Sequence, residues 1–373
     1  MNALRYLPFA LRGFRKAGPP LHLTVFVTGR CNARCRHCFH WREVAAGVAG
    51  PSVEQIGKLA DSAARMGPLL WVSFGGGEPF LREDLPELAR AFGRHGLRHL
   101  AIPTNGLVEE RQHQAVERML ALNPDLYLSV GVSFDGPPRI HDSIRQVPGG
   151  HARSMASLRA LKEQARGAAG RMGVTLLVCV TAENQHVLAE HLEELVRELR
   201  PDNVTVNLAR GTAMEPHLLE VDPDRYREVV AVKQRLFDEG VLPYFDFPLA
   251  RLARARDGLM YEHVERVARN GVPAGQRPPG HLPCTAGTLS AVVFEDGAVH
   301  PCEILGREIG RLDEHDWDLE RLWYGERAAE LRGQIAAEHC SCTWECAQAD
   351  NVLFNKRAWP ALARRVLQRS ERG

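Results

Sequence analysis

The chain has 373 residues, of which 45% are hydrophobic, and its 47 basic and 46 acidic side chains leave a formal net charge of +1. This length predicts two or three domains, and the balanced charge excludes a whole-chain field that would attract nucleic acid or a membrane. No apolar run reaches the roughly 18 residues of a spanning helix, and the first residues lack the pattern of a secretory signal. The sequence therefore predicts a cytoplasmic globular protein with no nucleic-acid partner.

Residues 1–20 form an amphipathic, basic segment. Its pattern consists of Leu4, Leu7, Leu11 and Phe14 beside Arg5, Arg12, Arg15 and Lys16. Such a segment can lie on a membrane surface. Because Pro8 interrupts the pattern, we favour a helix that caps an open barrel over contact with a membrane.

Residues 21–211 alternate between apolar runs typical of buried strands and helical patterns. The expected strands are 21–27, 69–74, 97–103, 126–134, 173–180 and 203–209. Alternation of this kind implies parallel strands joined by right-handed crossovers. We predict an α/β fold with a partial (β/α)6 barrel.

Unusual residues follow the end of every expected strand. They are the cysteine-rich stretch 29–41, then GGGEP (75–79), TNG (104–106), DGPP (135–138), TAEN (181–184) and RG (210–211). In barrels the chemistry lies at the carboxyl ends of the strands. We therefore expect one mouth lined by thiols, glycine backbone, a carboxylate and amides.

Nine cysteines in a chain without export signals indicate metal binding or catalysis rather than disulfides. Cys31, Cys35 and Cys38 lie within eight residues. Three thiolates can hold three irons of a [4Fe–4S] cluster and leave the fourth iron open to a ligand. A structural zinc site is the alternative, with His37 or His40 as the fourth ligand.

The C-x-x-x-C-x-x-C triplet followed by Phe39 resembles the signature of the radical S-adenosylmethionine (SAM) enzymes. The resemblance implies that SAM chelates the open iron. It also implies that an electron from reduced flavodoxin or ferredoxin splits SAM into methionine and a 5′-deoxyadenosyl radical, which removes a substrate hydrogen. The protein would aim and shield this chemistry.

The same resemblance implies further cofactor-binding residues. Those around the SAM methionine are Gly76, Gly77, Glu78 and Pro79, with Glu78 meeting the ammonium group. Softer matches are Asn105, Ser133, Asp135, Arg145 and Asn184. Ordinary loop chemistry is the alternative for the softer set, and a helix N-terminal acid is the alternative for Glu78. Cys179 is expected to be a buried core thiol.

Residues 212–283 lose the β/α rhythm and are expected to form a helical linker region. Beyond it, Cys284 and Cys302 bracket an expected hairpin whose turn contains Asp296 and Gly297. Three more cysteines follow at Cys340, Cys342 and Cys346. Five cysteines without a disulfide-permissive context indicate cluster ligands.

Residues 284–373 resemble the auxiliary-cluster domains of radical SAM enzymes, named SPASM, or twitch in the shorter form. Cys284, Gly297 and Cys302 meet the C-x₁₂-G-x₄-C element. The short cysteine run favours a small hairpin-plus-helix domain with one auxiliary [4Fe–4S] cluster. Among the candidate ligands, Cys346 is expected to be secure, while Cys340 and Cys342 compete for the remaining place. A zinc ribbon is the alternative.

The expected substrate is a ribosomal peptide or natural product. Only 30 residues precede Cys31, which is too short for a leader-binding domain, so a twitch-type oxidation of a small molecule or lipid is the alternative. Two non-enzymatic readings also remain, an iron–sulfur electron carrier and a zinc-stapled binding protein. Neither gives a role to the GGEP motif.

Overall fold

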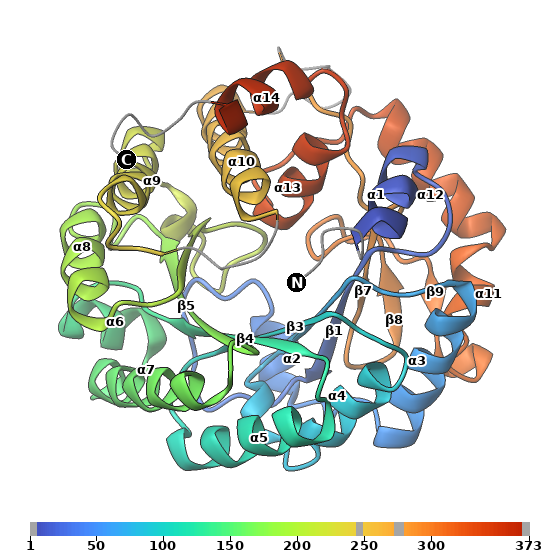
Figure 1. Ribbon diagram of the computed structural model, residues 1–373, viewed down its shortest axis with the longest axis horizontal. Helices are drawn as coiled ribbons and strands as arrows, with labels where there is room; N and C mark the ends of the chain where they lie inside the picture. The colour runs from blue at the N-terminus through green and yellow to red at the C-terminus, as the bar shows by residue number, and fades with distance from the viewer. Residues whose placement is uncertain (1–5, 244–248, 272–279, 368–373) are drawn as a thin grey trace.

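The computed structural model describes residues 6–243, 249–271 and 280–367, and Figure 1 shows it with its labelled elements. All six expected strands are confirmed. They are β1 (His22–Thr28), β2 (Trp71–Gly76), β3 (His99–Thr104), β4 (Tyr127–Ser133), β5 (Met172–Val180) and β6 (Asn203–Leu208). They are parallel and lie in chain order, with β6 at one edge.

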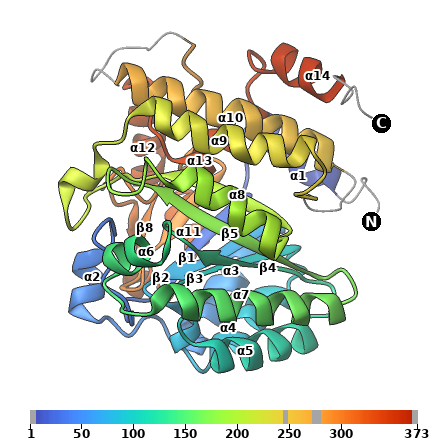
Figure 2. The same ribbon diagram turned by 90° about the vertical axis from the view of Figure 1, so that its left-hand side faces the viewer.

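Helices follow these strands and cover the outer face of the sheet, as Figures 1 and 2 show. The longer ones are α3 (Val53–Met66), α4 (Leu85–Gly93), α5 (Glu109–Leu122), α7 (Gly150–Gly167) and α8 (Leu188–Leu199). Short helices α2 (Trp41–Ala46), η2 (Pro79–Leu81) and α6 (Pro138–Arg145) lie in the loops at the carboxyl ends of β1, β2 and β4.

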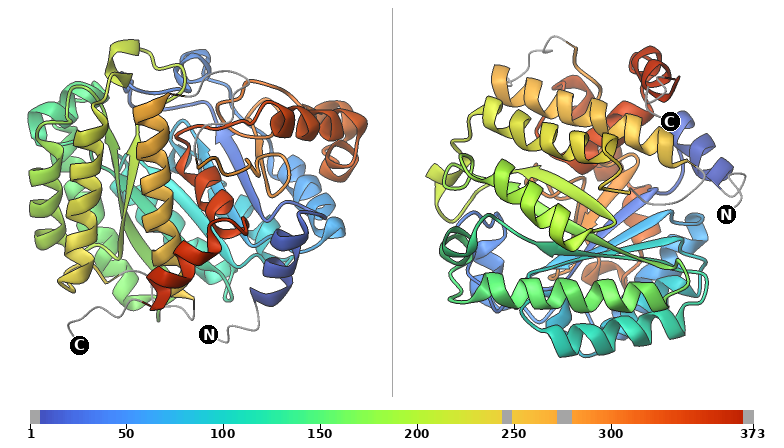
Figure 3. Two further views of the ribbon diagram at one scale, coloured as in Figure 1. Left: turned by 90° about the horizontal axis from the view of Figure 1, so that it is seen from above. Right: turned by 60° about the vertical axis from the view of Figure 1, so that its left-hand side comes forward.

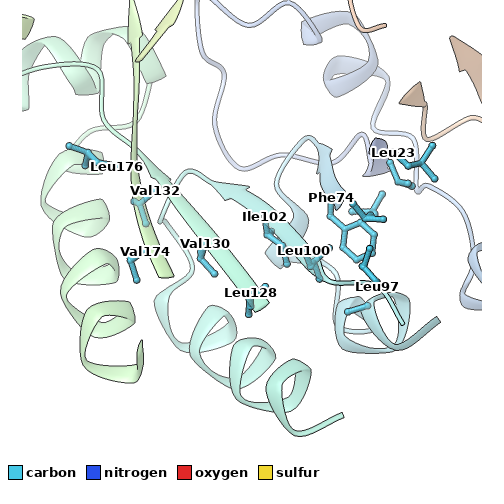
Figure 4. Packing of buried hydrophobic residues seen from close by; sticks show 14 of the residues in the cluster. Leu23, Phe74, Leu97, Leu100, Ile102, Leu128, Val130, Val132, Val174 and Leu176 are labelled. Carbon is cyan, nitrogen blue, oxygen red and sulfur yellow. The ribbon is translucent and has the colours of Figure 1, made fainter. Parts of the chain in front are cut away.

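The core lies between the sheet and these helices. Figure 4 shows strand residues such as Phe74, Leu100, Leu128 and Val130 packed together, and all four are fully buried. Nearly continuous burial explains why β4 and most of β5 are runs of apolar residues, whereas β3 alternates between buried and half-buried positions.

The expected hairpin forms from β7 (Ser290–Val293) and β8 (Ala298–His300), which are antiparallel, and β9 (Gly310–Arg311) follows it. Gly297 has a φ of +88°, the conformation for which glycine is favoured in the turn. The hairpin does not stand apart, because β7 pairs in parallel with β1 over four residues. The C-terminal part thus extends the barrel sheet to nine strands.

Residues 212–283, expected as a linker region, contribute to the core. They contain η3 (Pro216–Leu219), α9 (Pro223–Asp238) and α10 (Ala250–Asn270), and buried side chains such as Tyr226 and Val264 join the main cluster. Figure 1 shows α10 and α13 between the two ends of the open sheet. The remaining elements are η4 (Asp313–His315), α11 (Leu319–Trp323), α12 (Glu326–Ala337), α13 (Glu345–Leu353) and α14 (Trp359–Leu367).

The N-terminal segment contains helix α1 (Leu7–Arg15), and two expectations about it need correction. Pro8 does not interrupt the helix, because it occupies the first turn, where its missing N–H has no helical partner to lose. The expected apolar stripe also faces outward: Leu7 is 52% exposed and Phe14 49%, whereas Phe9 is buried. Leu4 and Arg5 lie outside the described residues.

No helix in the described ranges is both long and apolar enough to cross a membrane.

Candidate active site

The three cysteines lie on one loop, residues 29–40, at the carboxyl end of β1. Backbone hydrogen bonds fix this loop to the end of α6: the Arg34 N–H donates to the Arg145 carbonyl (3.2 Å) and the Arg36 N–H to the Ile144 carbonyl (2.8 Å). A tight turn brings the last two thiols together, because the Cys38 N–H donates to the Cys35 carbonyl (3.0 Å).

All three thiols are free and partly exposed. Burial raises the pKa of Cys35 to about 12 and that of Cys38 to about 11, while the Arg145 guanidinium acts in the opposite direction. The Asn105 amide nitrogen lies 3.9 Å from the Cys31 sulfur. Bound iron would supply the positive charge that these three thiols need to ionise, and the Asn105 amide already points at one sulfur. The arrangement therefore fits the ligand set of an iron–sulfur cluster.

The histidines proposed for a zinc site are engaged elsewhere or enclosed. His40 Nε2 lies 2.8 Å from the Glu295 carboxylate, and both side chains are buried. Burial lowers the pKa of His37, with Asp135 opposing. Over the described part of the chain, no three His, Cys, Asp or Glu side chains form a group that could hold a single metal ion, which the zinc reading would require.

The GGE motif after β2 packs against the start of the cysteine loop. The Gly77 N–H donates to the Thr28 carbonyl (2.7 Å) and the Glu78 N–H to the Arg30 carbonyl (2.8 Å). A Cβ atom at Gly76 would lie 2.2 Å from the Thr28 oxygen, and one at Gly77 would lie 2.1 Å from the Arg30 oxygen. Only glycine fits at both positions, so these residues first of all let β2 approach the loop.

The Glu78 carboxylate is buried and caps η2, which begins at Pro79. It accepts hydrogen bonds from the Asn105 N–H (2.7 Å), the Thr104 hydroxyl (2.9 Å) and the Phe80 N–H (3.1 Å). The alternative reading as a helix N-terminal acid therefore describes part of its role. A carboxylate has about four acceptor positions, so one remains for a ligand. Burial raises the pKa of Glu78 to about 7, against these hydrogen bonds.

Asp135 and Arg145 form a buried pair behind the cysteine loop, with the Arg145 Nε 2.8 Å from an Asp135 oxygen. Burial alone would raise the pKa of Asp135, but the Arg145 guanidinium, together with His37 and His141, holds it below its usual value. Asp135 is fully enclosed. One of its oxygens supports Arg145, while the other, Oδ1, is buried without a hydrogen-bond partner in the described residues. The expected position of Asp135 on the SAM or substrate side of the mouth stays a prediction.

Asn184 is also fully buried and ties two strand ends together. Its amide donates to the carbonyls of Asp135 (3.0 Å) and Cys179 (2.8 Å). These hydrogen bonds give Asn184 a structural role at the mouth, and its expected contact with a cofactor stays a prediction. Ser133, at the end of β4, is partly exposed. Cys179 is partly exposed as well, so it is not the fully buried core thiol that we expected.

Phe39 lies between the cysteine loop and the C-terminal part. It packs with Cys284, Cys342 and Ile304 around a cluster that includes Phe26 and Trp344. The aromatic residue that follows the triplet therefore joins the two cysteine groups through packing.

Four of the five C-terminal cysteines come together. The Cys284 and Cys340 thiols are in hydrogen-bonding contact, which raises the pKa of Cys284 and lowers that of Cys340. Cys342 is near both Cys302 and Cys340, and burial is the main reason that its pKa is raised to about 12. We therefore propose that Cys340 and Cys342 are both ligands of the auxiliary cluster, whereas the sequence left them competing for one place.

Cys346 lies apart from this group. Its charged neighbours are Glu303, Arg210 and Glu345, and its side chain is exposed although burial by surrounding protein raises its pKa to about 12. Because none of these neighbours is another cysteine, we propose that Cys284, Cys302, Cys340 and Cys342 are the auxiliary ligands, whereas the sequence predicted Cys346 as one of them.

Iron content tests this assignment. Replacing Cys340 or Cys342 by alanine should reduce the anaerobically reconstituted protein from about eight irons to about four per chain. Replacing Cys346 by alanine should leave about eight. If the Cys346 variant lost four irons instead, Cys346 would be an auxiliary ligand, as the sequence predicted.

Sequence reasoning missed the side chains that join the two halves of the site. His40 pairs with Glu295 of the hairpin turn, and Arg210 after β6 pairs with Glu345 at the start of α13 (2.5 Å). All four are buried or nearly so. Each pair joins residues more than 100 positions apart, so no local pattern could have indicated them.

Arg36, inside the triplet, was missed for the same reason. Its guanidinium binds both oxygens of Glu215 (2.8 and 2.7 Å) and also pairs with Glu183. These carboxylates follow β6 and β5, so Arg36 holds the cysteine loop to the far side of the mouth.

Comparison with known proteins identifies relatives of this arrangement. The model of the radical SAM superfamily matches residues 25–195. The PqqA peptide cyclase of Rhodopseudomonas palustris is 28% identical over 292 residues, which cover 75% of this chain and 72% of that protein. The Fe-coproporphyrin III synthase of Methanosarcina barkeri is 32% identical over 169 residues, covering 44% of this chain but only 40% of that protein.

Among solved structures, SuiB of Streptococcus suis bound to its precursor peptide SuiA is similar, with a TM-score of 0.60 and 15% identity. The superposition covers 88% of this chain and 71% of that one. At this identity the likeness concerns the fold, including the part that follows the barrel.

Proposed function

Given that this chain is a radical SAM enzyme with an auxiliary-cluster domain, we propose that its substrate is a peptide from which it removes a hydrogen atom. The observation that supports a peptide most is the extent of the match to PqqA peptide cyclase. A match of 292 residues is longer than the whole barrel of residues 21–211, so it includes C-terminal sequence. The match to a porphyrin enzyme spans only 169 residues.

When bound, the triplet cluster supplies the electron that splits SAM and yields the 5′-deoxyadenosyl radical for hydrogen abstraction. The chain's own residues prepare the site for this chemistry. Cys31, Cys35 and Cys38 would hold three irons, and the Asn105 amide donates toward one of the sulfurs. Arg145 places a buried cation near the thiolates, which offsets part of their charge.

Glu78 offers its free acceptor position to the SAM amino group. Cys284, Cys302, Cys340 and Cys342 would hold the auxiliary cluster, which either takes an electron from the substrate or binds the substrate. The electron donor would be reduced flavodoxin or ferredoxin, as the family resemblance implies.

Two measurements test this function in order. First, the reconstituted protein with SAM and dithionite should release equal amounts of 5′-deoxyadenosine and methionine. Second, short peptides encoded in the neighbourhood of the gene should be sought and synthesised with deuterium on their side-chain carbons, and the substrate among them should transfer deuterium into 5′-deoxyadenosine. Transfer from a deuterated sugar alcohol but not from the peptides would favour the small-molecule alternative. Absence of 5′-deoxyadenosine would contradict both.

A further inference from the structure

The two terminal helices carry most of the large apolar side chains that the described chain leaves exposed. There are seven of these side chains among the described residues, and five lie on α1 and α14. The five are Leu7, Leu11, Phe14, Trp359 and Leu367. We call the surface that they form the terminal patch. Exposed apolar side chains gathered in one place mark an interaction surface, whereas scattered ones need no explanation.

Helix α1 turns its apolar face outward, and α14 exposes two of its large apolar side chains. Leu7, Leu11 and Phe14 are spaced by four and three residues, so they share one face of α1, while Phe9 on another face is buried. On α14, Trp359 and Leu367 are exposed, whereas Leu362, which lies between them in the sequence, is buried. The orientation of α1 is the reverse of the usual surface helix, whose apolar stripe faces the core.

The two helices meet, so their exposed faces form one surface. The Phe14 ring contacts the Trp359 ring edge to face, with centroids 5.3 Å apart, and the Phe354 ring at 5.4 Å. Figures 2 and 3 show α1 and α14 at the same end of the molecule. The packing of Gly13 against Phe354, where a Cβ atom would lie 2.1 Å from the ring, keeps α1 in this place.

The charged side chains on the two segments that carry the terminal patch are all positive. Residues 6–16 and 355–367 contain no Asp or Glu, although the whole chain is nearly neutral. Exposed cations on these segments are Arg15, Lys16, Lys356, Arg357 and Arg364. None of these five forms an ion pair in the described ranges, whereas Arg365 pairs with Glu262. Apolar side chains beside unpaired cations, with no acid, complement an anionic lipid surface.

The terminal patch lies away from the mouth. Helix α1 packs on Leu21 and Leu289, which precede β1 and β7, and Tyr6 reaches His99 at the start of β3 (3.2 Å). The cysteine loop follows the opposite end of β1, about 23 Å along that seven-residue strand. A surface bound through the patch would leave the mouth open to solvent.

We propose that the terminal patch binds the surface of membranes that contain anionic lipids, with the mouth facing away from the bilayer. Binding combines insertion of the exposed apolar side chains with attraction of the cations to lipid headgroups. The surface potential of anionic lipids supplies this attraction, and salt screens it. No part of the proposal depends on which substrate the mouth accepts.

Flotation with vesicles tests the proposal on the reconstituted full-length protein. The wild type should float with vesicles containing about 30% phosphatidylglycerol in phosphatidylcholine, and not with pure phosphatidylcholine. The triple variant Leu7→Ser, Leu11→Ser, Leu367→Ser should bind at least about tenfold more weakly. The matched control is Val53→Ser, which changes an exposed apolar residue outside the patch. It should bind like the wild type.

A second variant tests the contribution of the cations separately from that of the apolar side chains. Arg15→Glu with Lys16→Glu should reduce binding to the anionic vesicles by about tenfold or more, as should about 0.5 M salt for the wild type. Equal iron content and equal 5′-deoxyadenosine release would show that both variants remain folded. Three outcomes would overturn the proposal. The first two are no flotation of the wild type and unchanged flotation of the triple variant. The third is a wild-type dimer that forms without vesicles and that the triple substitution dissociates into monomers.

Discussion

Replacing Cys35 by alanine is expected to stop the release of 5′-deoxyadenosine completely and to reduce the iron content from about eight to about four per chain. Cys35 is the central thiol of the loop that α6 and Arg145 hold in place. Without it, two thiolates remain, and a four-iron cluster with one open iron has too few ligands. Iron analysis and chromatography of the reaction mixture measure the two effects.

The matched control for this variant is Cys346→Ala, which removes a thiol that we propose is a ligand of neither cluster. It should keep both sets of irons. The change in the visible spectrum that SAM causes in the wild type should disappear in the Cys35 variant only. If the Cys35 variant still formed 5′-deoxyadenosine, the triplet could not be the site of SAM cleavage.

Replacing Glu78 by glutamine is expected to weaken SAM binding by about 10- to 100-fold, which corresponds to the loss of one hydrogen bond to a charged group. The iron content should stay near the wild-type value, because Glu78 is not a ligand. Isothermal titration of the reconstituted protein with SAM measures the affinity. Glu54→Gln, on an exposed side chain, is the control. An unchanged affinity in the Glu78 variant would limit this residue to capping η2.

The same carboxylate makes SAM binding depend on pH. Burial raises the pKa of Glu78 to about 7, so the side chain is largely ionised only above that value. Because the ionised form is the better acceptor for the SAM amino group, affinity should fall by up to about tenfold per pH unit below pH 7. The glutamine variant should lose this dependence. A wild-type affinity that rises on acidification would contradict the assignment.

Protein stability should show the opposite trend in the absence of SAM. A carboxyl group whose pKa is raised on folding favours the folded state while it is protonated. Its contribution is complete below the unfolded pKa of about 4.3 and is lost as pH rises toward 7. The free energy of unfolding, measured by denaturant titration of wild type and Glu78→Gln, should reveal this difference. SAM should offset the loss in the wild type.

The amino-acid sequence by itself determined the six parallel strands and the position of the mouth. Strands buried on both faces must be runs of apolar residues, and the spacing of Cys31, Cys35 and Cys38 is a local property of one loop. The hairpin was also predictable, because an Asp-Gly pair favours a tight turn and Gly297 adopts the positive φ that such a turn requires. Each of these features depends on residues that are close together in the sequence, so the sequence was sufficient to predict it.

Only the tertiary structure decided which side chains meet across the fold. It enclosed Asp135 and Asn184, grouped Cys340 and Cys342 with Cys284, and set Cys346 apart. It also joined β7 to β1 and turned the apolar face of α1 outward. The reason is physical: burial and long-range pairing depend on residues distant in sequence, and periodicity shows that a helix has an apolar face without showing what covers it.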